Sequence, residues 1–218
     1  MGGAFWTVLS IIVVAAWAGS LFLWFLVRHS RKAPLVDPKG SVKLLSVLGS
    51  GGHTTEMIDL LKAFDDSKYP DRYYVVAETD NHSESKAIAA ESARTGGHFA
   101  IFRIPRSREV GQSYVTAVFT TALAAAASFA LICRVRPSLV VVNGPGTCIP
   151  VAFSAALLDV LRIADTRIVY VESLCRVEKL SLSAAILYYS GVADDVIVQW
   201  PQLKDTYPRV LTVDELKE

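Results

Sequence analysis

The chain has 218 residues, enough for one domain of ordinary size and a short additional segment. Its formal net charge is +1, so charge gives no general attraction to nucleic acid, and we expect no nucleic-acid partner. Three cysteines, an odd number without a CxxC pair, fit neither a disulfide framework nor a zinc site.

The first predicted element is a membrane anchor. No charged residue occurs from Ala4 to Val27, and a helix of this length spans a hydrocarbon core of about 30 Å. A cleaved signal peptide is the alternative, but no basic residue precedes the run. Arg28, Arg31 and Lys32 follow it, so the positive-inside rule predicts a single pass with a cytosolic C-terminal part. We therefore expect an anchor over 4–27, a basic linker over 28–40 and a domain over 41–218.

Strands and helices are expected to alternate through the domain. The expected strands are 42–48, 72–77, 98–103, 138–142, 167–171 and 195–198, and the helices between them are 53–64, 81–93, 113–133, 147–161 and 177–189. This alternation predicts an α/β fold, a Rossmann-like parallel sheet with helices on both faces. The uncharged helix at 113–133 is long enough to be a second span, but its alanine and threonine content favours a buried or membrane-skimming helix.

The first expected strand ends in a glycine-rich turn, Gly49–Gly52. Glycines let the backbone approach an anion, and the free N–H groups at the start of the next helix point at it, so the turn predicts a phosphate site. His53 follows, and it is able to donate to a phosphate, to take a proton from a substrate hydroxyl, or simply to begin the helix. Gly49 and Gly51 fit the first two glycines of GxGxxG and Glu78 follows the second strand, so a nicotinamide dinucleotide is an alternative ligand, although Thr54 replaces the third glycine.

Further polar residues follow other strands. A second glycine-rich turn spans Asn143–Thr147, where Thr147 can cap the next helix, and two such turns on one sheet favour a diphosphate ligand. The arginines of Arg103–Arg108 suit a diphosphate or an anionic lipid surface, or are merely solvated. Glu172 after the fifth strand is a candidate base, a ligand for a sugar hydroxyl, or a helix cap.

Six blocks resemble one known family, in order along the chain. They are GSGGHTTEM at 49–57, QSYVTA at 112–117, NGPGTCIP at 143–150, YVES at 170–173, LSLSAAILYY at 180–189 and VQWPQLKDTYP at 198–208. On these blocks the chain resembles the membrane-anchoring subunit of the two-subunit UDP-N-acetylglucosamine transferase, member fourteen of the asparagine-linked glycosylation family.

The resemblance implies the N-terminal, acceptor-binding half of an inverting GT-B glycosyltransferase at the endoplasmic reticulum membrane. Its activity would add the second GlcNAc from UDP-GlcNAc to dolichyl-diphosphate-GlcNAc. A soluble donor-binding subunit would be recruited as partner, and the chain alone would be inactive. No metal and no cofactor are expected. A non-catalytic membrane scaffold, or a subunit of a related polysaccharide glycosyltransferase with another sugar, is the alternative.

The resemblance also implies roles for individual residues. His53 resembles the candidate base of single-chain relatives, with Glu172 as the other candidate. The family ends in a hydrophobic, glycine-containing segment, whereas this chain ends in the charged VLTVDELKE, so partner contact is expected at Leu180–Tyr189 and Gln199–Tyr207. The residues expected to hold the acceptor diphosphate are Gly49, Ser50, Gly51, Gly52, Thr54, Arg106, Arg108, Asn143, Gly144, Gly146 and Thr147.

Overall fold

The computed structural model describes residues 41–107, 112, 114–144 and 146–216, together with residues 6, 10, 13, 16, 19, 20, 23 and 24. Residues 1–35 and 36–218 form two units. In the first unit, Ser10 is helical and its hydroxyl donates to the Trp6 carbonyl at 2.8 Å. All eight described residues of this unit are helical, and the other residues of the predicted anchor and the whole basic linker lie outside the described residues. Among the residues described, no helix combines the length and the hydropathy needed to cross a membrane.

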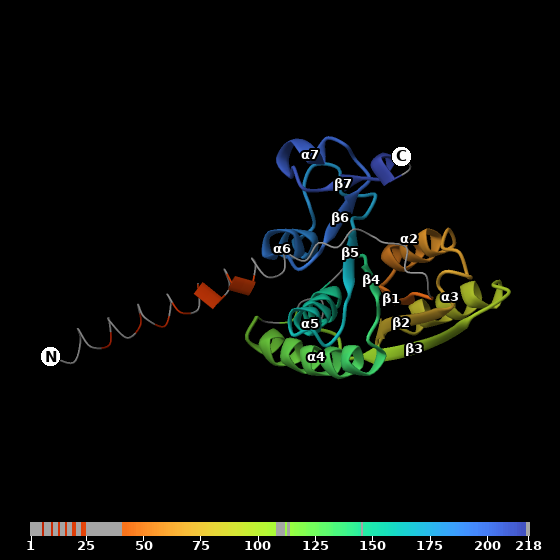
Figure 1. The fold of residues 1–218 in the computed structure, drawn as a ribbon, viewed down its shortest axis with the longest axis horizontal. Coiled ribbons are helices and arrows are strands. Elements are labelled where there is room, and N and C mark those ends of the chain that lie inside the picture. The colour runs from red at the N-terminus through yellow and green to blue at the C-terminus, as the bar shows by residue number, and fades with distance from the viewer. Residues whose placement is uncertain are drawn as a thin grey trace. The chain divides into compact units, whose positions relative to one another are not determined.

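The second unit is built on a seven-stranded sheet in the order β3-β2-β1-β4-β5-β6-β7, with all pairs parallel (Figure 1). The central strand β4 is entirely apolar and buried, as expected for a strand covered on both faces. The strands are β1 Lys43–Val47, β2 Asp71–Ala77, β3 His98–Ile104, β4 Leu139–Val142, β5 Arg167–Val171, β6 Asp195–Val198 and β7 Leu211–Thr212.

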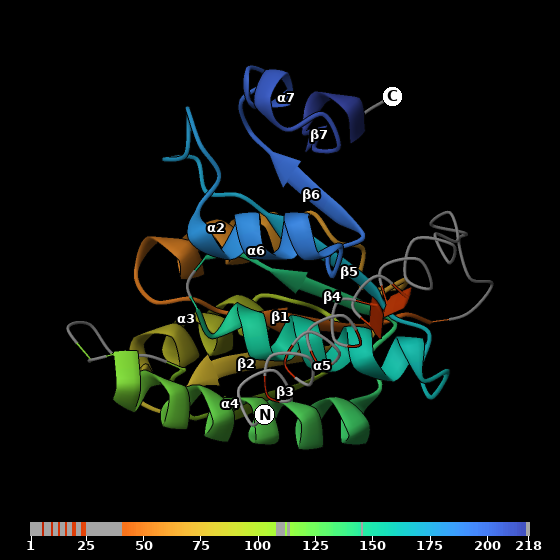
Figure 2. The ribbon, with the colours of Figure 1, turned by 90° about the vertical axis from the view of Figure 1, so that its left-hand side faces the viewer.

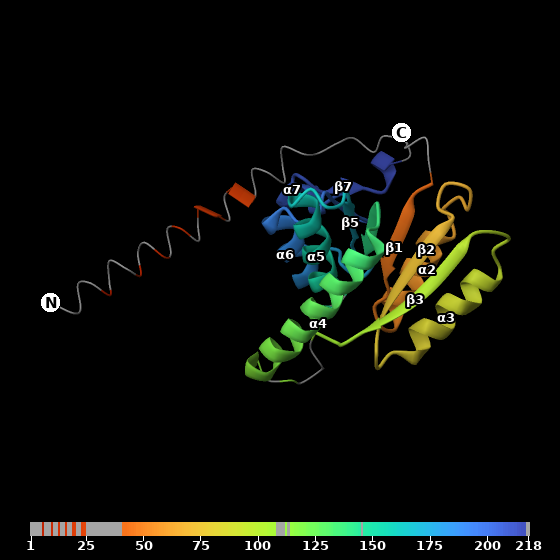
Figure 3. The same ribbon diagram turned by 60° about the horizontal axis from the view of Figure 1, so that its bottom comes forward.

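Helices cover both faces of this sheet. α2 and α3 lie on one face, whereas α4, α5 and α6 lie on the other (Figures 1 and 3). The strand order explains this division, because the chain moves outward from β1 to β3 and then returns to β4, and right-handed crossovers in opposite directions place their helices on opposite faces. The helices are α2 Gly52–Leu61, α3 Asn81–Ser92, α4 Tyr114–Val135, α5 Cys148–Val160, α6 Leu182–Ser190, α7 Leu203–Thr206 and the 3-10 helix η1 Asp214–Leu216.

The observed elements confirm the predicted parallel α/β sheet, and the six predicted strands agree within one residue at each end. The prediction was wrong for α6, which begins at Leu182 and not at 177, because the Ser181 hydroxyl accepts from the N–H of Ala184 and caps the helix there. The two-residue strand β7 and the four-residue helix α7 were not predicted.

A buried ion pair fastens α3 to the sheet at the amino end of β2. The side chains of Arg72 and Glu91 are 2% and 1% exposed and form a bidentate pair, with Nη2 to Oε2 at 2.7 Å. The Tyr74 hydroxyl donates to the same carboxylate at 2.5 Å, and Arg72 also donates to the carbonyl of Gly96. Since strands run from this edge toward the glycine-rich turns, the network lies at the opposite end of the sheet from the candidate site.

Candidate functional site

The first strand-end turn and the second are adjacent because β1 pairs with β4. His53 lies at the second position of α2, and its Nδ1 is 2.8 Å from Oδ1 of Asn143, which follows β4. An amide oxygen only accepts, so Nδ1 carries the hydrogen and, in the neutral ring, Nε2 keeps its lone pair. The two turns are thus joined through a histidine in the tautomer that a base acting at Nε2 requires.

A carboxylate fixes the orientation of Asn143. Its Nδ2 donates to Glu56 Oε2 at 3.1 Å, so the amide cannot be reversed without placing oxygen against oxygen. The other oxygen of Glu56 accepts from the Ser173 hydroxyl at 2.8 Å. Glu56 Oε2 is also 3.8 Å from Nδ1 of His53. The residues therefore form a chain from the turn after β5, through Glu56 and Asn143, to the imidazole.

Sequence reasoning did not select Glu56 or Ser173. The spacing of His53 and Glu56, three residues apart on one helix, is a signal that they share a face. The contacts with Asn143 and Ser173 span 87 and 117 residues and depend on the sheet order alone.

Gly144 allows His53 to lie where it does. Its φ of +95° is a conformation that favours glycine, and a Cβ built there would lie 2.6 Å from Cγ of the His53 ring. The buried Tyr170 hydroxyl is 3.4 Å from both the nitrogen and the oxygen of Gly144, and 2.9 Å from the Ser181 hydroxyl. Burial, followed by the charge of Glu172, raises the pKa of Tyr170 above its usual value, so this hydroxyl remains a neutral brace.

The first glycine-rich turn presents open backbone at the start of α2. Gly51 precedes the helix with φ +67°, and a Cβ placed on Gly51 or Gly52 would meet nothing within 4 Å. The first N–H groups of a helix lack intrahelical acceptors and carry the positive end of its dipole. Ser50, Gly51 and Gly52 are exposed, so this turn has both the space and the donors for an anion.

Thr54 does not present its side chain to this turn. It is fully buried, and its hydroxyl donates to the Gly49 carbonyl and contacts the Ser83 hydroxyl at 2.6 Å. Ser83 in turn donates to the same carbonyl at 3.0 Å and is held by Asp80, the N-cap of α3. The expectation that Thr54 binds the diphosphate is corrected for its side chain, which instead fixes the turn to α3.

The second turn is open at Gly146, where a Cβ would meet nothing within 4 Å. Thr147 is the N-cap of α5 but is buried, and its side chain makes no capping hydrogen bond, so the predicted hydroxyl cap is wrong. Cys148 begins α5 with its thiol 3.5 Å from the Asn143 carbonyl, and burial raises its pKa to about 12. The thiol is therefore neutral and serves in packing.

Glu172 is 2% exposed, and both of its oxygens accept backbone N–H groups. Oε1 accepts from Ser173 at 2.9 Å and Oε2 accepts from Ser181, the N-cap of α6, at 2.7 Å. Of the three roles that the sequence left open, these bonds favour the structural one, in which the carboxylate shapes the loop between β5 and α6.

The arginines lie further out. Arg106 is half-buried and follows β3, the outermost strand, with β2 between it and β1. Arg103 is engaged by Glu84, with Nη2 to Oε2 at 2.6 Å. Arg108 lies outside the described residues.

The turn after β6 contacts the turn after β5. Trp200 is 37% exposed, and its indole N–H donates to the carbonyl of Leu174 at 2.8 Å. At the ends of α6 and α7, Tyr188 and Tyr207 pack edge to face, and Arg209 stacks 4.3 Å above the Tyr188 ring. Both regions include residues for which the resemblance implied partner contact.

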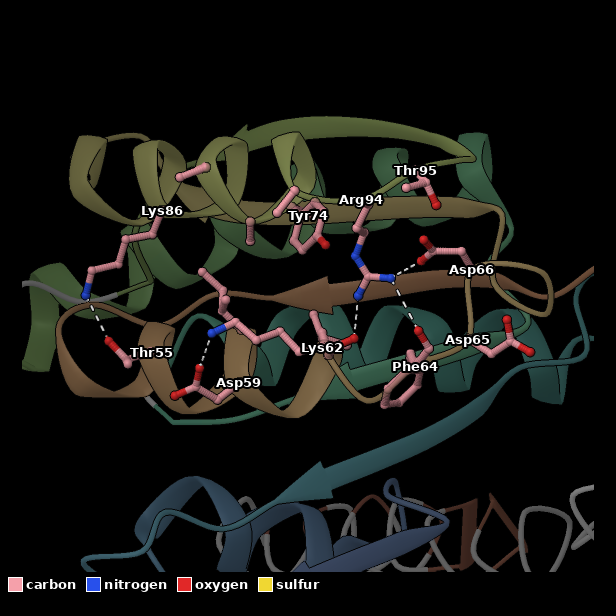
Figure 4. A pocket seen from close by; sticks show the side chains of 15 residues that line it. Thr55, Asp59, Lys62, Phe64, Asp65, Asp66, Tyr74, Lys86, Arg94 and Thr95 are labelled. Carbon is pink, nitrogen blue, oxygen red and sulfur yellow. Dashed lines mark hydrogen bonds and ion pairs between the residues drawn. The ribbon is translucent and has the colours of Figure 1, made fainter.

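A groove of about 940 Å³ runs between α2 and α3 (Figure 4). Tyr74 lies on its floor, and the charged groups along it contact one another: Lys62 pairs with Asp59 at 2.7 Å, and Arg94 pairs with Asp66. Lys86 donates to the Thr55 hydroxyl at 2.9 Å. The groove lies on a helical face of the sheet, away from the His53–Asn143 contact. Within the described part of the chain, no three His, Cys, Asp or Glu side chains are grouped as a metal site requires.

Comparison with known proteins identifies a family to which the chain is similar. The profile of the family described as "Oligosaccharide biosynthesis protein Alg14 like" matches residues 44–215. The human protein named UDP-N-acetylglucosamine transferase subunit ALG14 is 45% identical over 91% of this chain and 95% of its own length. The protein of the same name from Yarrowia lipolytica is 42% identical over 86% of this chain and 87% of its own length.

Solved structures resemble the chain in fold. MurG of Acinetobacter baumannii superposes with a TM-score of 0.57 at 17% identity, over 80% of this chain and 44% of MurG. A UDP-N-acetylglucosamine 2-epimerase from Listeria monocytogenes gives a TM-score of 0.51 at 17% identity, over 82% and 43%. The chain therefore spans less than half of each of these proteins, and at this identity the likeness concerns the fold alone.

Proposed function

The chain belongs to the family of Alg14-like oligosaccharide biosynthesis proteins, and on this basis we propose that it is the acceptor-binding subunit of a two-subunit inverting N-acetylglucosaminyltransferase. The reaction adds the second GlcNAc from UDP-GlcNAc to dolichyl-diphosphate-GlcNAc, in synthesis of the N-glycan precursor. The partner is a soluble, donor-binding subunit that supplies the other half of a GT-B enzyme. The family and the names of the relatives favour this function over the nicotinamide alternative.

The proposed arrangement has an anchor at 4–27, a basic linker at 28–40 and an acceptor domain at 41–218. The protein is a single-pass component of the endoplasmic reticulum membrane, with the domain in the cytosol. The support is the uncharged run followed by basic residues.

The observation that carries the mechanism is the contact between His53 and Asn143. His53 Nε2 takes the proton from the acceptor 4-hydroxyl while the hydroxyl oxygen attacks the anomeric carbon of the donor sugar and UDP leaves. The Glu56 carboxylate, 3.8 Å from Nδ1, stabilises the imidazolium that forms. Glu172 is the less favoured base, because backbone N–H groups already occupy its oxygens.

The acceptor diphosphate binds at the two open turns in this proposal. Backbone N–H groups at Ser50, Gly51 and Gly52 and around Gly146 hold it, because these positions leave space above the backbone. Asn143 and Gly144 contribute mainly by placing His53. Arg106 and Arg108 are proposed to add positive charge for the diphosphate.

The test is co-expression of the full chain with its donor-binding partner, purification of the pair from membranes, and assay of sugar transfer. The expected product from UDP-GlcNAc and a polyprenyl-diphosphate-GlcNAc is the disaccharide on the same lipid. An intact pair that transfers nothing to this acceptor, or that uses only another sugar, would overturn the proposal. A His53→Ala chain that binds the partner but loses turnover would exclude a mere scaffold, whereas full turnover of this variant would remove His53 from the role of base.

A further inference from the structure

The loop between β5 and α6 is held at both ends by one buried carboxylate. Oε1 of Glu172 accepts from the N–H of Ser173 at 2.9 Å, and Oε2 accepts from the N–H of Ser181 at 2.7 Å. Residues 174–179 between these two points are all exposed and form the light blue loop beside the first turn of α6 (Figure 2). Because Glu172 is 2% exposed and bonded to both ends, it sets the distance between them.

From Ser173, a series of hydrogen bonds leads to a nitrogen of the His53 ring. The Ser173 hydroxyl donates to Oε1 of Glu56 at 2.8 Å, and Oε2 of Glu56 accepts from Nδ2 of Asn143 at 3.1 Å. Oδ1 of Asn143 accepts from Nδ1 of His53 at 2.8 Å. Each bond orients the next side chain in the series, so the position of Ser173 bears on the position of the imidazole.

From Ser181, a second series reaches the same ring at a carbon atom. The Ser181 hydroxyl is 2.9 Å from the Tyr170 hydroxyl, which lies 3.4 Å from both the nitrogen and the oxygen of Gly144. Gly144 lies against the imidazole, since a Cβ built on it would be 2.6 Å from Cγ of His53. The two ends of the loop therefore approach one imidazole by separate routes, and both ends are held by Glu172.

We propose that Glu172 is a positioning residue, which holds Ser173 and Ser181 so that both series of contacts keep the His53 ring in place. The role rests on the proposed function, in which Nε2 of His53 takes the proton of the acceptor hydroxyl. Glu172 itself does not meet the acceptor. Its effect on the reaction passes through His53, where a displacement of about 1 Å costs on the order of a hundredfold in rate.

Capping of α6 alone does not account for these contacts. The hydroxyl of Ser181 already caps that helix, because it accepts from the N–H of Ala184 at 3.2 Å. The bond from Glu172 to the N–H of Ser173 is outside α6, and the Ser173 hydroxyl is directed at Glu56 on α2. The carboxylate thus connects α6 to the helix that carries the proposed base.

The kinetic test uses the full chain with its donor-binding partner. Ser173→Ala, which removes one hydroxyl, should lower kcat about fivefold and Glu172→Gln about tenfold, with KM for both substrates within about twofold of the unmodified value. Two buried positions on α5 provide matched controls. Asp159→Asn changes another buried carboxylate, and Ser154→Ala removes a hydroxyl that donates to the carbonyl of Pro150 at 2.7 Å. Both controls should retain kcat.

Combined variants separate positioning from the other roles. In a His53→Ala chain, Glu172→Gln should lower kcat further by less than about twofold, because no ring is left to place. Ser173→Ala should likewise add less than about twofold in a Glu56→Ala chain. A base at position 172, or a residue that only stabilises the fold, would keep its full effect without His53, and that result would overturn the proposal.

A spectroscopic measurement on the chain without its partner does not depend on activity. The full chain, labelled with nitrogen-15 histidine in detergent micelles, is studied at about pH 8, where an ordinary imidazole is neutral. The His53 signal, assigned by its loss in His53→Ala, should show the hydrogen on Nδ1 in the unmodified chain and in Ser154→Ala. In Glu172→Gln and Ser173→Ala, both tautomers should be populated.

An unchanged His53 tautomer in these two variants would overturn the positioning role. If Glu172→Gln does not fold, Ser173→Ala decides alone, because it removes a single oxygen atom. A pair that transfers no sugar, in which the tautomer still changes as expected, would refute the proposed function and leave the placement of His53 by Glu172 intact.

Discussion

His53 and Asn143 are 90 residues apart in the chain, yet Nδ1 of one lies 2.8 Å from Oδ1 of the other. The contact exists because β1 and β4 are neighbours, so that the turns following them meet at one edge of the sheet. It fixes the tautomer of the ring and leaves Nε2 for chemistry. Predictions about activity start from this pair.

Replacing His53 by Ala should lower kcat of the partnered enzyme on the order of a hundredfold or more, because the acceptor hydroxyl loses its base. His53→Gln should lose as much, since glutamine can donate to Asn143 but accepts no proton. The control is His82→Ala on the exposed surface of α3, which should retain activity. Steady-state assays with both subunits present decide the matter, and near-normal turnover of His53→Ala would remove the residue from this role.

Glu56 should act through position and charge. Glu56→Gln keeps the size of the side chain but removes the negative charge 3.8 Å from Nδ1, so kcat should fall about tenfold with little change in KM. Steady-state assays beside the exposed control Asp59→Asn measure this effect, and equal kcat values for the two variants would show that Glu56 is only a packing residue.

Gly144→Ala should inactivate the enzyme while the fold remains. The added methyl would lie 2.6 Å from the His53 ring, and φ +95° is strained for alanine, so the histidine must move. Gly146→Ala is the matched variant, because its methyl enters open space; His53 should keep its place and any effect should appear in KM. Comparable kcat values for the two variants would argue against this account.

Stability should depend on the buried pair at the other edge. Glu91→Gln removes the bidentate carboxylate from the Arg72 guanidinium, which is 2% exposed and keeps only Asp66, at 3.6 Å, as an acid partner; it should cost about 3 kcal/mol of unfolding free energy. The exposed pair of Lys62 and Asp59 is a control, since Lys62→Ala should change stability by less than about 1 kcal/mol. Urea unfolding of the three proteins measures both values, and equal costs would refute the assignment.

Alkaline pH should unfold the protein through its buried tyrosines. Burial is the largest cause that raises the pKa values of Tyr74 and Tyr170, followed by the hydrogen bond to Glu91 for the first and the charge of Glu172 for the second. The unfolded chain loses these protons near pH 10 while the folded chain keeps them, so stability is complete below about pH 10 and falls above it. Each tyrosine contributes at most about 1.4 kcal/mol per pH unit. Tyr170→Phe should therefore make the unfolding free energy fall less steeply between about pH 10 and about pH 11. Tyr189→Phe, at an exposed position, should leave this slope unchanged.

The sequence was sufficient for six of the seven strands because each is a short run rich in aliphatic or aromatic residues between turn signals, and β4 is apolar throughout. It failed for β7, whose two residues are too few to show a period, and for the start of α6, where Ser181 lies between two leucines within the predicted helix. The sequence also could not predict which way a side-chain hydroxyl points. Thr54 and Thr147 have the spacing of ligand residues, but both side chains are buried by packing. Glu56 escaped notice because its partners come from distant strands.

Trp200 offers a practical consequence. The chain has four tryptophans, and the other three precede residue 25, so this indole is the sole one from Ser41 onward. Its N–H ties two strand-end loops together, and more than a third of the side chain meets solvent. Once Trp6, Trp17 and Trp24 are changed to Phe, all tryptophan fluorescence comes from Trp200. Its emission would then report, without an added label, any molecule that covers the carboxyl ends of the strands.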